Sequence, residues 1–378
     1  MDAVSPLMGM RPPQGITATA APIALGSIAA GLLMMEIERI QQGRIDGSIL
    51  GIESFHDLAD RAAQTSRLVR NRRCRFDHTA DLPEFVADLH TSELAAGVRG
   101  ARNIAVFGRR FVSTVGCPRC PRGVAHVWRF VRDAENCTAS CPSCGECLVT
   151  NGMDLLDALP LTDLASPLGE IRLAKLGLRV GDLLLVEGAE AVRSFEYRPD
   201  AESDGIVDGA GDAIRTLVVV GLGNIGSNLV DAIVRSLSPL TDRLILIDPD
   251  TYEAANLAGQ RIDASDVGHP KAIVQARYAL RRRPFLSVVA YVSRVEEVPP
   301  GVLRGALVAS CVDSRAARQS IAEMAWRMGA PFVDAAVDAT VPAVRIAGYR
   351  PGPDSACLEC AFHDDDYAAI EQRVACVS

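Results

Sequence analysis

The stretch Gly221-Leu222-Gly223-Asn224-Ile225-Gly226 decides the fold, because it follows the apolar run Leu217 to Val220 and opens a helix. Glycines let the backbone turn tightly and approach a phosphate, and a helix N-terminus supplies N–H groups and a positive dipole end. Asp248 lies 22 residues beyond Gly226, at the end of a second apolar run, where a carboxylate can bind ribose hydroxyls. These residues predict an adenosine-nucleotide site, but they do not distinguish NAD from ATP.

Apolar runs and helical patterns alternate from residue 215 onward. The sequence predicts strands at 217–220, 244–247, 286–292, 305–311 and 331–336, and helices at 224–234, 270–282 and 314–329. Strands separated by helices imply βαβ units. We therefore expect an α/β fold of Rossmann type with a mainly parallel sheet.

Four further motifs follow the glycine stretch in order. They are Asp248-Pro249-Asp250, Asn256-Leu257-Ala258-Gly259-Gln260-Arg261, Gly268-His269-Pro270-Lys271, and Cys311-Val312-Asp313-Ser314 with a later Arg318. This set resembles the ThiF/MoeB and ubiquitin-activating-enzyme family, whose pattern is Asp-x-Asp, Asn-Leu-x-Arg-Gln, Gly-x-x-Lys and Cys-x-Asp-Asn with a later Arg. The resemblance runs from Thr216 to Cys360, and it favours ATP over a nicotinamide or flavin cofactor.

The resemblance implies an enzyme that adenylates a carboxylate with ATP and Mg²⁺. Positive charge must then be held where two anions meet. By resemblance, Lys271 neutralises phosphate and Asp313 holds Mg²⁺, while Asn256 orients phosphate and Asp248 binds ribose. The other residues of the matching motifs that would bind the nucleotide are Gly221, Gly223, Asn224, Gly226, Asp250 and Gln260. As alternatives, Lys271 begins a solvated helix and Asp313 caps the helix that follows it.

Two departures from the family pattern bear on activity. Gly259 stands where the family has an arginine, and Arg261 follows two residues later. The stretch before the first strand is acidic, whereas many relatives carry an arginine-bearing helix there. Arg261 is our further catalytic candidate, and Arg315 or Arg318 are other groups that could compensate. A non-catalytic ThiF-like module that presents a peptide to a partner enzyme is the alternative function.

Segments that relatives carry after a Cys-x-x-Cys pair occur here before the glycine stretch. Residues 29–37 resemble the later small-residue helix of the family, and residues 74–78 stand where its second metal-ligand pair belongs. We expect a circular permutation, in which residues 1–80, with helices at 26–41 and 53–70, complete the ThiF-type domain of residues 201–378. Two incomplete copies, each completed by another chain, are the alternative.

The same resemblance implies a Zn²⁺ site and a reactive thiol. Tetrahedral zinc accepts three thiolates and one imidazole, which Cys74, His78, Cys357 and Cys360 would supply. The alternative is that Cys74 and His78 are unrelated surface residues. Cys376 lies where a crossing-loop cysteine of related enzymes takes a thioester or persulfide, so a thiol transfer step is expected there. An ordinary terminal cysteine is the alternative.

The middle of the chain is rich in cysteine. Cys-x₂-Cys-x₂₀-Cys-x₂-Cys is the spacing of a zinc ribbon, and the residues that form it are Cys117, Cys120, Cys141 and Cys144. Cys137 and Cys147 are spare, so the choice of ligands stays open, and a redox dithiol is the alternative. Residues 81–200 are therefore predicted to form a small zinc-binding α+β accessory domain that docks a protein or peptide.

Composition excludes two function classes. The net charge is −8, the opposite sign from a nucleic-acid-binding chain. The uncharged stretch 15–35 is rich in Ala, Gly, Thr and Ser, and Arg11 is the only basic residue before it, so we expect a buried helix, no membrane span and a cytoplasmic location. The basic tract 61–75 is interpreted as a solvated helix face rather than a docking patch. By resemblance, the partners are a ubiquitin-like or sulfur-carrier protein or peptide and a second copy in a homodimer.

Overall fold

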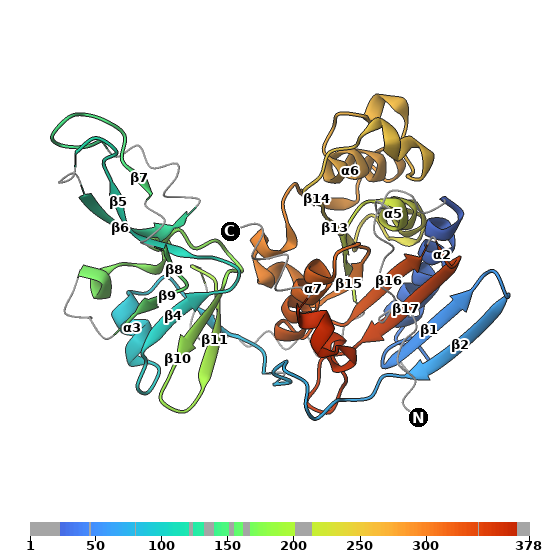
Figure 1. Cartoon of the computed structure of the whole chain (residues 1–378), viewed down its shortest axis with the longest axis horizontal. Coiled ribbons are helices and arrows are strands. Elements are labelled where there is room, and N and C mark those ends of the chain that lie inside the picture. The colour runs from blue at the N-terminus through green and yellow to red at the C-terminus, as the bar shows by residue number, and fades with distance from the viewer. Residues whose placement is uncertain are drawn as a thin grey trace. The chain divides into compact units, whose positions relative to one another are not determined.

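The computed structural model describes residues 23–44, 47–79, 81–120, 124–131, 140–150, 155–161, 167–200, 214–338 and 340–368. The chain divides into two compact units. The first unit takes Met1–Asp81, Gly209–Val298 and Leu303–Ser378, and the second takes Leu82–Asp208 and Pro299–Val302. Figure 1 shows the elements of each unit.

An eight-stranded mixed sheet forms the centre of the first unit, in the order β14-β13-β12-β15-β16-β17-β1-β2. Its strands are β12 (Thr216–Val220), β13 (Arg243–Ile247), β14 (Ser287–Tyr291), β15 (Ala306–Ser310), β16 (Phe332–Asp338), β17 (Ala343–Tyr349), β1 (Ile52–Asp57) and β2 (Ala62–Arg67). Strands β14 to β16 pair in parallel, as predicted. The remaining pairs, from β16 to β2, are antiparallel. The α/β prediction is confirmed, and the parallel arrangement applies to one part of the sheet.

Helices cover this sheet because the central strands are apolar on both faces. All five residues of β15 are buried, a pattern typical of a strand covered on both sides. The helices are α2 (Ile23–Gln41), α5 (Asn224–Ser236), α6 (Lys271–Arg282) and α7 (Arg315–Arg327), with short 3₁₀ turns η5 (Ala254–Ala258), η6 (Ala264–Asp266), η7 (Val295–Glu297) and η9 (Leu358–Ala361). A further turn, η8 (Pro300–Leu303), belongs mostly to the second unit. The four predicted helices at 26–41, 224–234, 270–282 and 314–329 are thus confirmed.

Helix α2 packs beside α5 and against β16 and β17 (Figure 1). Its buried side chains include Leu25, Ala29, Leu33, Ile37 and Ile40, which recur every three or four residues and therefore lie on one face. Gly26 allows the close approach, since a Cβ there would lie 2.0 Å from Asn224 Oδ1. None of the helices in the described ranges is long and apolar enough to cross a membrane.

The helix expected at 53–70 is wrong, because β1 and β2 form an antiparallel hairpin there. Asp57 Oδ1 accepts hydrogen bonds from the backbone N–H groups of Ala59 (2.9 Å) and Asp60 (3.1 Å), which forms the turn. Pairing with β17 outweighs any local helical preference, since that strand is buried along its whole length. The basic tract 61–75 is correspondingly a strand and a loop rather than a helix face. The part of residues 1–80 that is described is therefore not wholly helical.

The second unit is mostly β-structure. One five-stranded sheet has the order β3-β11-β10-β4-β9, and in a second sheet β5 pairs with β6, β7 and β8. Its elements are β3 (Glu84–Val86), α3 (Thr91–Ala96), β4 (Asn103–Val106), β5 (Phe111–Gly116), β6 (Val124–Phe130), β7 (Val149–Thr150), β8 (Leu155–Leu156), β9 (Ala158–Pro160), η3 (Pro167–Glu170), η4 (Leu173–Leu176), β10 (Leu183–Glu187) and β11 (Val192–Tyr197). The core includes the stacked rings of Phe111 and Phe130, whose centroids lie 4.7 Å apart.

Candidate nucleotide site and cysteine clusters

The glycine loop after β12 requires glycine at two positions. Gly221 has a φ of 85°, and a Cβ there would lie 2.8 Å from the carbonyl oxygen of Cys311. A Cβ at Gly226 would lie 1.9 Å from the carbonyl oxygen of Gly221. Gly223 stands at the N-cap of α5 and brings no side chain to the first-turn N–H groups. The loop thus presents bare backbone at a helix N-terminus, which is the geometry that binds phosphate.

Three polar segments meet at one edge of the sheet. The glycine loop, Asp248 and residues 311–313 each follow the carboxyl end of a strand, and these strands, β12, β13 and β15, are parallel neighbours. Because β13 and β15 flank β12 on opposite sides, the chain reverses its direction of winding at this point. Ligands of open α/β sheets bind at such switch points.

Asp248 holds the glycine loop in place. Its Oδ2 accepts a hydrogen bond from Leu222 N at 2.6 Å, and its Oδ1 accepts one from Asp250 N at 2.8 Å. Burial raises the pKa of Asp248, although the two N–H donors and the charge of Lys271 oppose the rise. The structure therefore shows that the Asp248 carboxylate holds the glycine loop, and its binding of ribose stays a prediction.

Lys271 is the first residue of α6, and its ammonium group faces Asp250. The distance from Lys271 Nζ to Asp250 Oδ2 is 2.9 Å. The lysine side chain is 11% exposed, whereas that of Asp250 is 64% exposed. An ion pair with one exposed partner contributes little to stability, so a phosphate can compete for the lysine.

Two amide side chains in the segment after β13 are buried, and one of them lies near the glycine loop. Asn256 Oδ1 accepts a hydrogen bond from Glu253 N at 2.8 Å, within the capping box of η5. Gln260 is 7% exposed, and its Oε1 has no hydrogen-bond partner among the described residues. Its Nε2 lies 3.9 Å from the position that a Cβ of Gly223 would take. Because buried polar atoms nearly always have a hydrogen-bond partner, we expect this oxygen to accept a hydrogen bond from a bound ligand.

The arginines considered as compensating groups each have a carboxylate partner. Arg261 Nη2 lies 3.3 Å from Asp231 Oδ2. Arg315 pairs with Asp366, and Arg318 pairs with Asp334. Asp313, in contrast, is exposed in the loop after β15, immediately before the N-cap residue Ser314 of α7. Its accessible carboxylate is placed where a bound cation can reach it.

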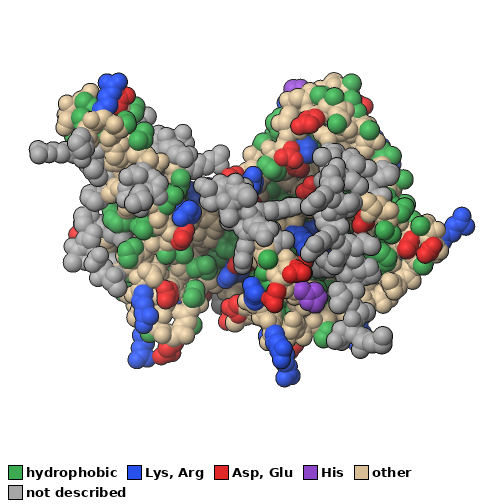
Figure 2. Space-filling view, in the orientation of Figure 1, with side chains coloured by type: hydrophobic (Ala, Val, Ile, Leu, Met, Phe, Trp, Pro, Cys, Tyr) green, Lys and Arg blue, Asp and Glu red, His purple; other side chains and the backbone are tan. Residues whose placement is uncertain are grey.

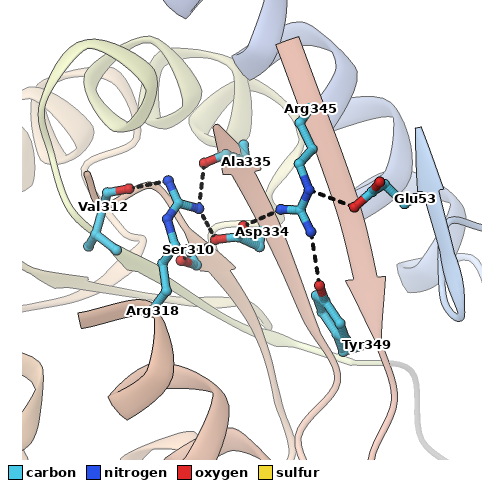
Figure 3. A network of polar contacts seen from close by, with 8 residues as sticks. All are labelled: Glu53, Ser310, Val312, Arg318, Asp334, Ala335, Arg345 and Tyr349. Atoms are coloured by element: carbon cyan, nitrogen blue, oxygen red, sulfur yellow. Dashed lines mark hydrogen bonds and ion pairs between the residues drawn. The ribbon is translucent and has the colours of Figure 1, made fainter. Parts of the chain in front are cut away.

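A buried network that the sequence analysis missed lies below this edge (Figure 3). Arg345 of β17 contacts Glu53 of β1 (Nε to Oε2, 2.6 Å) and Asp334 of β16 (Nη1 to Oδ2, 2.9 Å). Asp334 also accepts hydrogen bonds from Ser310 Oγ and from Arg318. A charged residue in the interior of an apolar strand was the signal available in the sequence, as Asp334 is in 332–338 and Arg345 is in 343–349.

One cysteine cluster joins the two ends of the first unit. Cys74, His78, Cys357 and Cys360 offer ligand atoms that all lie within 4.8 Å of one another. The sulfurs of Cys74 and Cys357 are 3.6 Å apart, and the sulfur of Cys360 is 3.5 Å from His78 Nε2. His78 Nδ1 lies 3.1 Å from the carbonyl oxygen of Ser355, which orients the ring. Three thiols and one imidazole fit tetrahedral Zn²⁺.

The second cluster lies in the second unit. It consists of Cys117, Cys120, Cys141 and Cys144, whose sulfurs also lie within 4.8 Å of one another. Cys147 is exposed and is not part of it. These four thiols fit a structural zinc ion. Cys137 and Cys376 lie outside the described residues.

On the face shown in Figure 2, basic side chains of the described residues occur in small groups beside acidic ones. Electrostatic attraction to a polyanion depends on basic groups gathered on one surface. This distribution lends no support to a nucleic-acid surface on the described part of that face.

A glycine loop, a buried carboxylate and a lysine at the switch point of a parallel sheet are features typical of α/β nucleotide-binding modules. Residues 213–377 match the model described as the ThiF family. This part of the chain is similar to the ThiF family.

Two curated relatives share this region. The adenylyltransferase and sulfurtransferase UBA4 of Yarrowia lipolytica is 31% identical over 150 residues, which are 39% of this chain and 36% of the relative. The NEDD8-activating enzyme E1 catalytic subunit of Saccharomyces cerevisiae is 28% identical over 156 residues, which are 39% of this chain and 50% of the relative. The matches thus span half or less of the length of each relative.

Among solved structures, E. coli MccB with ATP is 22% identical, with a TM-score of 0.34 over 43% of this chain and 47% of that chain. E. coli MccB with AMPCPP and a selenomethionine form of MccA is 24% identical, with a TM-score of 0.34 over 42% of this chain and 48% of that chain. TM-scores of this size do not establish a common overall structure.

Proposed function

We propose that this chain uses ATP and Mg²⁺ to adenylate the C-terminal carboxylate of a ubiquitin-like or sulfur-carrier protein, or of a peptide. The match to the ThiF family and two relatives named as an adenylyltransferase and an activating enzyme support this proposal. The glycine loop is the observation that carries it, because Gly221 and Gly226 leave no room for side chains beside a helix N-terminus. Lys271 and Asp313 supply complementary charges at the same edge of the sheet.

Each residue would contribute by holding charge in place. The loop backbone and the N-terminus of α5 would bind phosphate oxygens, and Lys271 would exchange Asp250 for a phosphate. Asp313 would hold Mg²⁺, an ion that neutralises phosphate charge. An oxygen of the substrate carboxylate then attacks the α-phosphorus, the bond from that phosphorus to the bridging oxygen breaks, and pyrophosphate leaves. The products are an acyl adenylate and pyrophosphate.

We further infer that both cysteine clusters hold structural Zn²⁺ and that residues 1–80 complete the ThiF-type domain. Support comes from α2 on α5, from β1 beside β17, and from the four ligand atoms that Cys74, His78, Cys357 and Cys360 bring together. Residues 81–200 would dock the substrate, and two copies of the chain would form a homodimer. Transfer of the acyl group to Cys376 stays a prediction.

Exchange of labelled pyrophosphate into ATP, dependent on an added carrier protein or peptide, tests the proposal. We expect exchange in the wild type and its loss in Lys271→Ala and Asp313→Ala. Arg281→Ala is the matched control, because Arg281 is an exposed cation of the same helix α6. Exchange that persists in both site variants would refute the assigned roles.

A non-catalytic module is the second candidate. It is favoured by Gly259, which replaces the family arginine, and by the carboxylate partners of the nearby arginines. Such a module would bind a carrier or peptide, measured by calorimetry, and show no pyrophosphate exchange with any carrier that it binds.

A further inference from the structure

We propose that Glu53, which lies outside the ThiF-family match, is a positioning residue for the nucleotide site. It would act through the buried charge chain, which we define as Glu53, Arg345, Asp334 and Arg318, and which ends on the loop that carries Asp313 (Figure 3). This inference rests on the proposed function, because it concerns the residue expected to hold Mg²⁺.

The first half of the charge chain holds Arg345 in place. The guanidinium group donates from Nε to Glu53 Oε2 at 2.6 Å, from Nη1 to Asp334 Oδ2 at 2.9 Å, and from Nη2 to Tyr349 Oη at 3.1 Å. Arg345 is 3% exposed, and Glu53 is 4% exposed. All three nitrogens of the guanidinium group are therefore engaged in a site that excludes water, and Glu53 supplies one of its two negative partners.

The second half of the charge chain connects Asp334 to the loop after β15. Arg318 donates to Asp334 Oδ1, to the carbonyl oxygen of Ala335 at 3.0 Å, and to the carbonyl oxygen of Val312. Ser310, the last residue of β15, donates to the same Asp334 oxygen at 2.8 Å. Val312 directly precedes Asp313, so Arg318 holds the backbone beside the proposed magnesium ligand.

The same loop supports the glycine loop. The Cys311 N–H donates to the Val220 carbonyl oxygen at 2.8 Å, and the Cys311 carbonyl lies against Gly221. A displacement of residues 311–313 would therefore disturb both the phosphate-binding backbone and the position of Asp313.

Charge balance explains why Glu53 matters at a distance. Two carboxylates and the Arg345 guanidinium group are buried, and the Arg318 side chain is 14% exposed, so the charge chain is largely enclosed and formally neutral. Without the charge of Glu53, Asp334 alone would balance Arg345 and Arg318 in a medium of low dielectric. Arg345 would then draw the Asp334 carboxylate toward itself, and Arg318 would hold the Val312 carbonyl less firmly.

The test compares Glu53→Gln, which keeps an acceptor for Arg345 Nε, with Glu36→Gln. Glu36 is the matched control, because it is a part-buried acid of the same N-terminal segment that pairs with Arg39 and the Ile49 N–H. Two readouts are measured: amide hydrogen exchange at residues 312–314 without nucleotide, and the Mg²⁺ concentration needed for half-maximal binding of a fluorescent ATP analogue.

We expect Glu53→Gln to speed exchange at residues 312–314 and to raise the required Mg²⁺ concentration by about 2- to 30-fold. Glu36→Gln should change neither. A Glu53→Gln protein that melts at a lower temperature but keeps wild-type exchange and Mg²⁺ dependence would overturn the inference, because a merely structural role predicts that result. If Glu53→Gln does not fold, Arg318→Lys replaces it, since a lysine cannot bond to Asp334 and Val312 in the same fork geometry.

Failure of the proposed function would look different. A wild type that binds no ATP analogue at any Mg²⁺ concentration refutes the function, whereas faster exchange at 312–314 in Glu53→Gln would still support the positioning of the loop.

Discussion

Substituting Gly226 with alanine should weaken nucleotide binding and leave the protein folded. The new Cβ would lie 1.9 Å from the carbonyl oxygen of Gly221, so the loop must open by about 1.5 Å to restore ordinary contact. A movement of that size exceeds the tolerance of a hydrogen bond, and losing one bond to a phosphate costs about 1.5–3 kcal/mol. We therefore expect ATP binding to weaken by roughly 10- to 150-fold.

The assay is calorimetric titration with ATP and Mg²⁺, together with thermal unfolding. Crowding in the loop should lower the free energy of unfolding by about 1–3 kcal/mol, which leaves the protein folded at 25 °C if its stability is ordinary. Gly31→Ala in α2 is the control, because a Cβ there would meet nothing within 4 Å, and alanine favours the helix. Wild-type affinity in Gly226→Ala would refute the assignment of this loop to the nucleotide.

Three further outcomes are expected. Native mass spectrometry should find two zinc ions per chain and one in either Cys360→Ser or Cys144→Ser; two in each variant would contradict the assigned ligands. Burial acts to raise the pKa of Asp231, but Tyr278 and nearby arginines outweigh burial and lower this pKa. The Asp231 carboxylate therefore stabilises the fold above roughly pH 4, and this contribution is lost as the pH falls through the folded-state pKa. Asp231→Asn should consequently lower Tm at pH 7 but much less at pH 3, and an equal loss at both would argue against this coupling. Arg345→Leu leaves the buried Glu53 carboxylate without its cation and should cost about 3–5 kcal/mol in urea unfolding, although Asp334 keeps Arg318; a cost below about 1 kcal/mol would show that the charge chain is not needed.

The parallel half of the sheet was predictable because its signals are local. A glycine motif between an apolar run and a helical pattern specifies strand, turn and helix within a few residues, as found for 216–236. Each later strand carries the same continuous apolar pattern, which identifies it without knowledge of its neighbours.

The hairpin formed by β1 and β2 was not predictable from its own residues. Six of its twelve strand residues are Ala, Ser, Glu or Gln, which have no strong preference for strands, and β2 is largely exposed. Its structure depends on the edge of β17, a strand almost 300 residues away, through pairs such as Ser54 with Ile346. Sequence periodicity cannot report a contact of that kind.

The candidate site was likewise predictable only in part. Its motifs were found by spacing, and the structure brings the glycine loop, Asp248 and residues 311–313 to one edge of the sheet. What escaped prediction is how charges pair: Lys271 with Asp250, Arg261 with Asp231, and Glu53 with Arg345. Which charged side chains pair depends on their proximity in the folded protein. From the sequence alone, each of these residues could pair with several others of opposite charge.

A crystal structure of this chain with a non-hydrolysable ATP analogue and Mg²⁺ would locate the nucleotide and its ligands. We expect a triphosphate wrapped by residues 221–226, with the Lys271 ammonium moved from Asp250 to a phosphate oxygen and Mg²⁺ bound to Asp313. Nucleotide bound elsewhere, or Lys271 still on Asp250 with Asp313 turned away from the phosphates, would contradict this expectation.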